Sequence, residues 1–223
     1  YRDESKAAFL PRFFKTGKGE YGEGDQFIGV VVPNLRIVAK KHFDADFDTF
    51  RELLASPYHE YRLTALLALT YRYAKLKDHA SRETCVNFYV SQVDAINNWD
   101  LVDLSCYKIL GHWLFDKDKQ LLYDWAKENH LWKQRIAMIS CMHFVKQGEF
   151  KDALAIADLL QHHPHDLIHK AVGWILREIG KEDEQLLIDY LTPRYKEMPR
   201  TMLRYAIERF EEGKRKTFLN SMI

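Results

Sequence analysis

The sequence predicts an all-α fold, a right-handed α-solenoid in which consecutive helix pairs stack along one chain. Nearly every segment of the 223 residues carries apolar side chains at the three- and four-residue spacing of an amphipathic helix. Capping residues and short turns separate these segments. A sustained strand-type alternation is missing, so we treat residues 1–223 as a single helical domain.

The N-terminal part holds the least regular elements. The first predicted helix covers residues 7–15. The next ten residues, 16–25, include four of the ten glycines of the chain and are predicted to form a loop. This loop lacks the residue order of a P-loop, and no strand precedes it. Residues 27–33 are the one strand-like run, and Pro33 suits the first turn of a helix to about Lys41.

The rest of the chain is predicted to be helical throughout. The expected helices are 46–54 capped by Asp46, 57–73 opened by Ser56 and Pro57, 81–93, 99–115, 118–128, 131–146 capped by Asn129 and stopped at Gly148, 150–161, 166–179 ended at Gly180, 182–191 and 199–212. Consecutive helices form pairs of about the size of a HEAT-type repeat. Because no long crossover is present, a solenoid with a concave face is favoured over a closed bundle.

The distribution of charge indicates a basic second half. The net charge is only +1, but residues 131–148 contain three Lys or Arg and no acid, and residues 194–216 contain eight Lys or Arg against four Glu. A near-neutral chain of this kind can still present a basic face to nucleic acid.

Cysteine usage and hydropathy give the expected compartment. The three cysteines stand singly and match no disulfide or zinc spacing, which is typical of a reducing compartment. No apolar run is long enough to cross a bilayer, and the first residues lack the apolar stretch of a signal peptide. We therefore expect a cytoplasmic protein without membrane contact.

The central candidate site is the segment 97–105. On a helix, Trp99 and Asp103 stand one turn apart and share a face, so an indole lies beside a carboxylate. Arg135 and Trp174 fall on later helices about one repeat apart, so one concave face could carry all four side chains. The alternative is a surface Asp beside core tryptophans.

This set of residues suits the chemistry of an alkylated purine. A purine that is already cationic leaves as a neutral base and needs no general acid. A carboxylate would stabilise the positive charge that develops on the deoxyribose and orient the attacking water, and indole faces would add cation–π attraction. Lys170 and Arg177 lie on the face of Trp174 and could hold backbone phosphates, although solvated charges remain the alternative.

Other chemistries have weaker support. His165 and His169 have a spacing that can bind zinc, but no H-E-x-x-H motif is present, and we expect no metal. No G-x-S-x-G motif indicates a nucleophilic serine. Asp100 and Asp103 are too close in sequence to flank a sugar as a glycosidase pair.

Six stretches in order resemble the AlkD-type DNA alkylation repair glycosylases, a family of HEAT-like repeat proteins. They are FFKTG with GEYGEGD (residues 13–17 and 19–25), GVVVPNLR (29–36), WDLVD (99–103), WKQR (132–135), KAVGWILRE (170–178) and MPRTMLRYA (198–206). The resemblance covers almost the whole chain.

The resemblance implies excision of N3- and N7-alkylated purines from double-stranded DNA, as base excision repair of alkylation damage, without flipping the base into a pocket. It assigns Asp103 as the catalytic carboxylate, Trp99 and Trp174 as the lining of the deoxyribose, and Arg135 as a backbone contact. Tyr21 and Arg204 join Lys170 and Arg177 as expected DNA-binding residues. The family uses no metal and no cofactor, and we expect a monomer.

One departure from the family pattern stands out. Two residues after Gly29 the family usually has Arg or Gln, whereas this chain has Val31. A DNA contact could be lost there.

The alternatives to a DNA glycosylase are a non-catalytic HEAT-repeat protein that binds distorted or branched DNA, and a protein-interaction scaffold. The sequence leaves open the preference between N3-methyladenine and N7-methylguanine, and the tolerance of bulky adducts.

Overall fold

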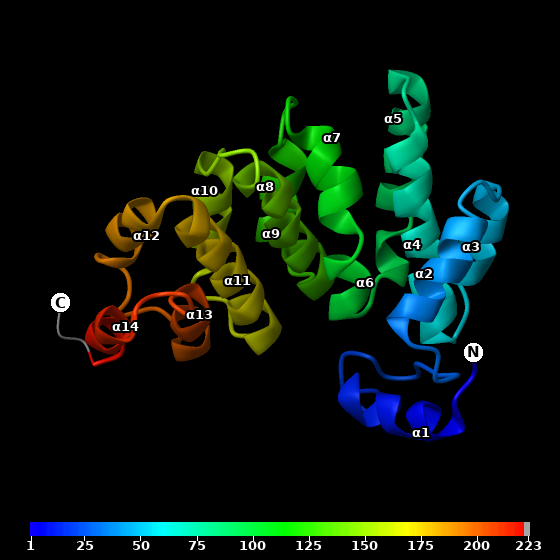
Figure 1. Cartoon of the computed structure of the whole chain (residues 1–223), viewed down its shortest axis with the longest axis horizontal. Coiled ribbons are helices and arrows are strands. Elements are labelled where there is room, and N and C mark those ends of the chain that lie inside the picture. The colour runs from blue at the N-terminus through cyan, green and yellow to red at the C-terminus, as the bar shows by residue number, and fades with distance from the viewer. Residues whose placement is uncertain (221–223) are drawn as a thin grey trace. The chain divides into compact units, whose positions relative to one another are not determined.

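The computed structural model describes residues 1–220, and its regular structure in this range is helical. Figure 1 shows the course of the chain. The chain divides into two compact units, residues 1–113 and a second unit that begins at Leu114. The prediction of an all-α fold is confirmed. Among the described residues, every helix is too short or too polar to cross a membrane.

The first unit is organised around one long central helix, α4. Its elements are α1 (Glu4–Phe13), α2 (Val32–Lys41), α3 (Phe47–Leu54), α4 (His59–Lys75), α5 (His79–Ser91), the short 3₁₀ turn η1 (Val93–Ala95), α6 (Trp99–Asp103) and the π-helical turn η2 (Tyr107–Gly111), followed by α7 (His112–Leu114). Helices α2, α3, α5 and α6 all pack against α4. The leucines of α4 are almost fully buried, so this helix forms the core of the unit.

The second unit repeats a pattern of paired helices. Its elements are α8 (Gln120–Lys127), α9 (Leu131–Val145), α10 (Lys151–Leu160), α11 (Asp166–Glu182), α12 (Glu184–Leu191), α13 (Arg200–Ala206) and α14 (Glu212–Leu219). Helix α9 packs on α8, α10 and α11, and α11 packs in turn on α12 and α13. Helices α9 and α11 run side by side in Figure 1. This neighbour-to-neighbour packing is that of a helical repeat array.

Some helix ends lie where the sequence predicts them, and others do not. Asp46 caps α3 as predicted, because its carboxylate accepts the N–H of Thr49. The predicted cap at Asn129 is wrong: His130 caps α9 by accepting the N–H of Lys133. Gly148 has φ 78°, which fits the predicted stop after α9.

The strand-like run at residues 27–33 does not form a strand. The chain makes one isolated bridge between Gln26 and Tyr58. The next three backbone N–H groups, of residues 28–30, donate instead to the carboxylate of Glu60. A side chain therefore satisfies the donors that a strand would give to a neighbour.

The predicted helix 99–115 is broken into three pieces. The hydroxyl of Ser105 donates to the carbonyl of Leu101 at 2.5 Å, a type of side-chain bond that bends helices. A π-helical turn over Tyr107–Gly111 follows, and such turns frequently occur at functional sites. Helix α6, with Trp99 and Asp103, is thereby a separate five-residue element.

Two further boundaries differ from the prediction. Helix α11 does not end at Gly180 but continues to Glu182, and a Cβ at residue 180 would meet the side chain of Leu187. This glycine serves close packing rather than termination. The predicted helix 199–212 ends at Ala206, because the chain then turns to bury Ile207 and Phe210, and α14 starts after its cap Glu211.

Candidate functional site

Trp99 and Asp103 lie at the two ends of α6 in the first unit. Both side chains are half-buried, whereas Asp100, Leu101 and Val102 between them are buried. Helical geometry places residues i and i+4 about 40° apart around the axis. The indole and the carboxylate therefore share one face of α6, as the sequence predicted.

An aromatic cluster from α1 holds the Trp99 indole. The Phe14 ring stacks on Trp99 with centroids 5.4 Å apart, and Phe13 approaches the same indole edge-on at 6.0 Å. Phe13 is 50% exposed and Phe9, one turn earlier, is 61% exposed. An aromatic surface thus extends from Trp99 along α1.

A cluster of buried charged residues lies behind α6. His59 on α4 is 2% exposed and contacts two carboxylates: its Nε2 lies 2.9 Å from Asp100 Oδ2, and its Nδ1 lies 3.4 Å from Asp25 Oδ2. Arg62 also reaches Asp25, with Nη2 at 2.5 Å from Oδ2. The amide of Asn97 donates to Asp25 Oδ1 at 3.0 Å. We call Asp25, His59, Arg62 and Asp100 the buried charge cluster.

The charge state of the cluster follows from these contacts. Burial alone would lower the pKa of His59, but its hydrogen bonds to Asp100 and Asp25 outweigh burial and raise the pKa to about 9. Burial would raise the pKa of Asp25, but hydrogen bonds from His59, Arg62 and Asn97 lower it below its ordinary value. His59 is therefore a cation between anions at neutral pH.

The glycine-rich loop is an ordered part of this site. The carboxylates of Glu20 and Glu23 accept the N–H groups of Gly17 and Gly19, each at 2.8 Å. A Cβ at Gly22 would meet the Phe14 carbonyl and the Asn98 amide, so the loop packs closely beside α6. Tyr21, which the sequence assigned to DNA binding, is half-buried at this point of the loop.

In the second unit, Trp174 and Arg177 are held by acidic neighbours. Trp174 is half-buried on α11, and its Nε1 donates to Glu178 Oε1 at 3.2 Å. Arg177 pairs with Glu208 through Nη1, and its Nε lies 3.5 Å from Glu178 Oε1. Gly173 allows α13 to approach beside Trp174, because a Cβ there would meet the backbone of Met202.

The other predicted DNA contacts differ in exposure. Arg135 on α9 is only 4% exposed, and its Nη1 donates to the carbonyl of Leu167. Lys170 pairs with Asp166 at 2.6 Å on the half-exposed face of α11. Arg204 on α13 is exposed. The structure thus groups Tyr21, Trp99 and Asp103 in the first unit, and the remaining predicted residues in the second.

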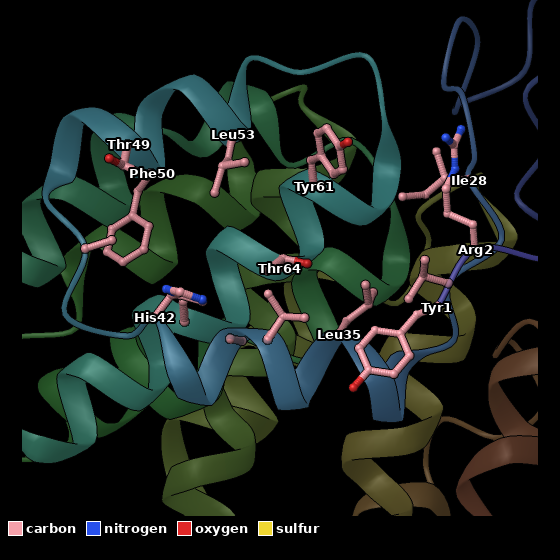
Figure 2. A pocket seen from close by; sticks show the side chains of 15 residues that line it. Tyr1, Arg2, Ile28, Leu35, His42, Thr49, Phe50, Leu53, Tyr61 and Thr64 are labelled. Carbon is pink, nitrogen blue, oxygen red and sulfur yellow. The ribbon is translucent and has the colours of Figure 1, made fainter.

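A separate apolar cavity lies in the first unit, between α2, α3 and α4. Its volume is about 430 Å³ and its lining is mostly aliphatic and aromatic. Figure 2 shows Phe50 and His42 at one end and Tyr1 with Leu35 at the other. Trp99 and Asp103 are not among its lining residues, so this cavity is distinct from the candidate site.

The sequence motifs predict no role for Asp25, His59 or Arg62, and Asp100 stands in the sequence only as half of an unsuitable glycosidase pair. A signal was available, because His59 and Arg62 fall on the same helix face as Leu63 and Leu66, where apolar residues are expected. The two carboxylate partners of His59 lie 34 and 41 residues away in sequence, and periodicity carries no information on such pairs. Within the described range, no group of three or more His, Cys, Asp or Glu residues is placed to hold a metal ion.

Comparisons with known proteins identify the relatives of this chain. A family model described as DNA alkylation repair enzyme matches residues 1–210. No curated protein matches the sequence. Solved structures with the same fold include a predicted DNA alkylation repair enzyme from Enterococcus faecalis, with 13% identity, TM-score 0.71 and coverage of 95% of this chain and 97% of that chain, and AlkD2 from Streptococcus mutans, with 15% identity, TM-score 0.58 and coverage of 94% and 99%. The family resemblance predicted from the sequence is confirmed.

Proposed function

Because the chain belongs to the DNA alkylation repair enzyme family, we propose that it is a DNA glycosylase that hydrolyses the N-glycosidic bond of cationic N3- and N7-alkylated purines in duplex DNA. The observation that carries this proposal is the face of α6, where the half-buried carboxylate of Asp103 lies one turn from the half-buried indole of Trp99. A carboxylate next to an aromatic face suits a cationic sugar better than it suits a phosphate.

Hydrolysis of the N-glycosidic bond of an alkylated purine requires little acid catalysis. When the C1′–N bond of an alkylated purine breaks, the electron pair goes to the base, which leaves as a neutral molecule. The sugar becomes positively charged. Asp103 would stabilise this charge electrostatically and accept a proton from the water that attacks C1′. The Trp99 ring would add cation–π attraction.

Residues of the second unit are proposed to bind the same DNA. From the second unit, Trp174 would contact DNA through its indole, and Arg135, Lys170 and Arg177 would contact phosphates. Lys170 and Arg177 are already paired with carboxylates, but such surface pairs are weak and phosphates can replace the acids. Arg135 is held by Leu167, so a phosphate would meet a preoriented guanidinium.

We propose further that the damaged base stays in the helical stack. Trp99 and Asp103 lie on the partly exposed face of a short helix, and the apolar cavity of the same unit is lined by other residues. A contact with the sugar from outside the duplex would avoid the cost of base flipping. Cys85, Cys106 and Cys141 are buried and form no disulfide, which supports a reducing, cytoplasmic setting.

The test is release of methylated purines from methylated duplex DNA, measured by chromatography. We expect Asp103→Asn to reduce release by about 100-fold or more and to leave the Kd for DNA unchanged. Asp48→Asn is the control, because Asp48 is exposed on α3, and it should retain full activity. Undiminished release by Asp103→Asn would overturn the mechanism. DNA binding without release by the unmodified protein would favour a non-catalytic binder.

A further inference from the structure

The orientation of α6 depends on contacts outside the helix. It contains only five residues, far fewer than a helix needs for stability of its own. Trp99 and Asp103 are at its ends, so any rotation about the helix axis moves both side chains relative to the sugar they are proposed to contact. The contact that fixes this rotation must come from a residue of α6 that faces inward.

Asp100, Leu101 and Val102 all face inward, and Asp100 is the one of these three whose side chain makes directional hydrogen bonds. It is 4% exposed, and its Oδ2 accepts a hydrogen bond from His59 Nε2 at 2.9 Å. Oδ1 accepts the N–H of Leu101 at 2.9 Å, which fixes the plane of the carboxylate. Trp99 precedes Asp100 by one residue and Asp103 follows it by three on the same short helix, so holding Asp100 sets the direction of both side chains.

His59 also reaches Trp99 through a ring. Phe14 lies between them, with its centroid 4.7 Å from the His59 ring and 5.4 Å from the Trp99 ring. On its other nitrogen His59 meets Asp25, which ends the glycine-rich loop, and Arg62 meets the same carboxylate. The His59 imidazolium thus connects α4 to the glycine-rich loop through Asp25, to the end of α1 through Phe14 and to α6 through Asp100.

The energetics of buried ion pairs indicate that the buried charge cluster has a role beyond stabilising the fold. Two buried cations and two buried anions cancel in charge, but apolar side chains of similar volume often stabilise a fold equally well. Buried ion pairs can instead select one arrangement among several, because other arrangements leave a charge unpaired. Here the selected arrangement is that of α6.

We propose that His59 is a positioning residue for Trp99 and Asp103, acting through Asp100 and through the stacked Phe14 ring. The proposal rests on the glycosylase function proposed above, but its spectroscopic test does not. The groups that face His59 are Asp25 from the loop, Asp100 from α6 and Arg62 from α4.

The first measurement is the indole N–H resonance of Trp99 in a nitrogen-15 spectrum, assigned with Trp99→Phe. His59→Gln keeps a hydrogen-bond donor but removes the charge, and should shift this resonance. Asp100→Asn is nearly isosteric and should shift it as well, which keeps the test open if the first variant folds poorly. Glu60→Gln is the matched control, because Glu60 lies on the same helix and binds the backbone of residues 28–30 rather than α6.

The second measurement is excision in single turnover with saturating enzyme. We expect His59→Gln and Asp100→Asn to slow the chemical step by about tenfold or more with an unchanged Kd for DNA. Glu60→Gln should lower the Tm but keep the excision rate below melting. An unshifted Trp99 resonance in folded His59→Gln or Asp100→Asn would overturn the proposal, as would an equal shift in Glu60→Gln. If the unmodified protein excises no base, the proposed function fails and the resonance alone decides on positioning.

Discussion

Val31 marks a position where one side chain can change DNA affinity. It precedes α2, and 37% of its surface is exposed, so a longer side chain fits without repacking. We predict that Val31→Arg increases the affinity for DNA, and that the slope of log K against log salt becomes steeper by about 0.9, the value for one added phosphate contact. Fluorescence anisotropy between 50 and 200 mM salt, a range of about fourfold, measures both.

Ile37→Arg is the control for this prediction. Ile37 is exposed on the same helix, six residues further along and on another face. It should change the slope less than Val31→Arg does. Equal steepening by both variants would mean that the added charge acts at long range and that position 31 is no contact.

Arg135 combines a structural and a binding role in one side chain. It is almost fully covered and donates to the Leu167 carbonyl. We predict that Arg135→Ala flattens the salt dependence of DNA binding by about 0.9 in slope and lowers the free energy of unfolding by about 1–3 kcal/mol, since a partly buried acceptor loses its donor. Binding titrations and urea denaturation separate the two effects. Arg209→Ala, an exposed change in the same unit, should leave stability unaltered, and an unchanged salt slope in Arg135→Ala would argue against a phosphate contact.

At the scale of elements, Gly173 controls how closely α11 and α13 pack beside Trp174. A Cβ at this position would meet the carbonyl of Met202 and the side chain of Tyr205. We predict that Gly173→Ala lowers the free energy of unfolding by about 1–3 kcal/mol, the cost of overpacking, although alanine has the better helix propensity.

Gly213→Ala provides the comparison. Its Cβ would meet the carboxylate of Glu211, the cap of α14 that accepts the Gly213 N–H, and a small shift of this exposed side chain relieves the contact. This variant should be neutral or more stable by up to about 1 kcal/mol. Urea denaturation of both variants measures the difference, and a neutral Gly173→Ala would show that α13 can move away from α11 at little cost.

The elements that the sequence predicts well are those that local signals define. Apolar periodicity locates α3, α4 and α9 to within a few residues, and Asp46 marks the start of α3. The failures have long-range causes. Glu60 replaces a strand partner for residues 28–30, and Leu187 explains Gly180. The pairing of Trp99 with Asp103 needed only helical spacing, whereas the His59 contacts with Asp25 and Asp100 depend on tertiary structure.

For the whole molecule, the buried charge cluster predicts how stability changes with pH. The pKa of His59 is about 9 in the folded state, against 6.5 for a histidine exposed to water in the unfolded chain. The folded chain therefore binds more protons than the unfolded chain between these values, and stability falls as pH rises from 6.5 to 9. A shift of this size corresponds to a loss on the order of 3 kcal/mol.

At acidic pH, stability changes with pH in the opposite direction. The pKa of Asp25 is lowered, so its contribution is lost as pH falls below the ordinary aspartate range. Burial lowers the pKa values of His163 and His165. Below pH 6.5 the unfolded chain therefore binds more protons at these histidines than the folded chain does, and stability falls as pH decreases. We therefore expect maximal stability near pH 6.5. Urea denaturation at pH 6.5 and 8.5 should show the decline, and His59→Gln should abolish it. An equal decline in His59→Gln would assign it to other groups.

The buried charge cluster also constrains how related sequences can diverge. Losing the charge at one of the positions 25, 59, 62 and 100 leaves an opposite charge buried without compensation, which is costly, whereas replacing all four together by apolar residues costs little. Single substitutions in the buried charge cluster are therefore destabilising, and we expect selection to remove them. We expect Asp25, His59, Arg62 and Asp100 to be inherited together, with natural variants of the family carrying either all four residues or apolar residues in their place.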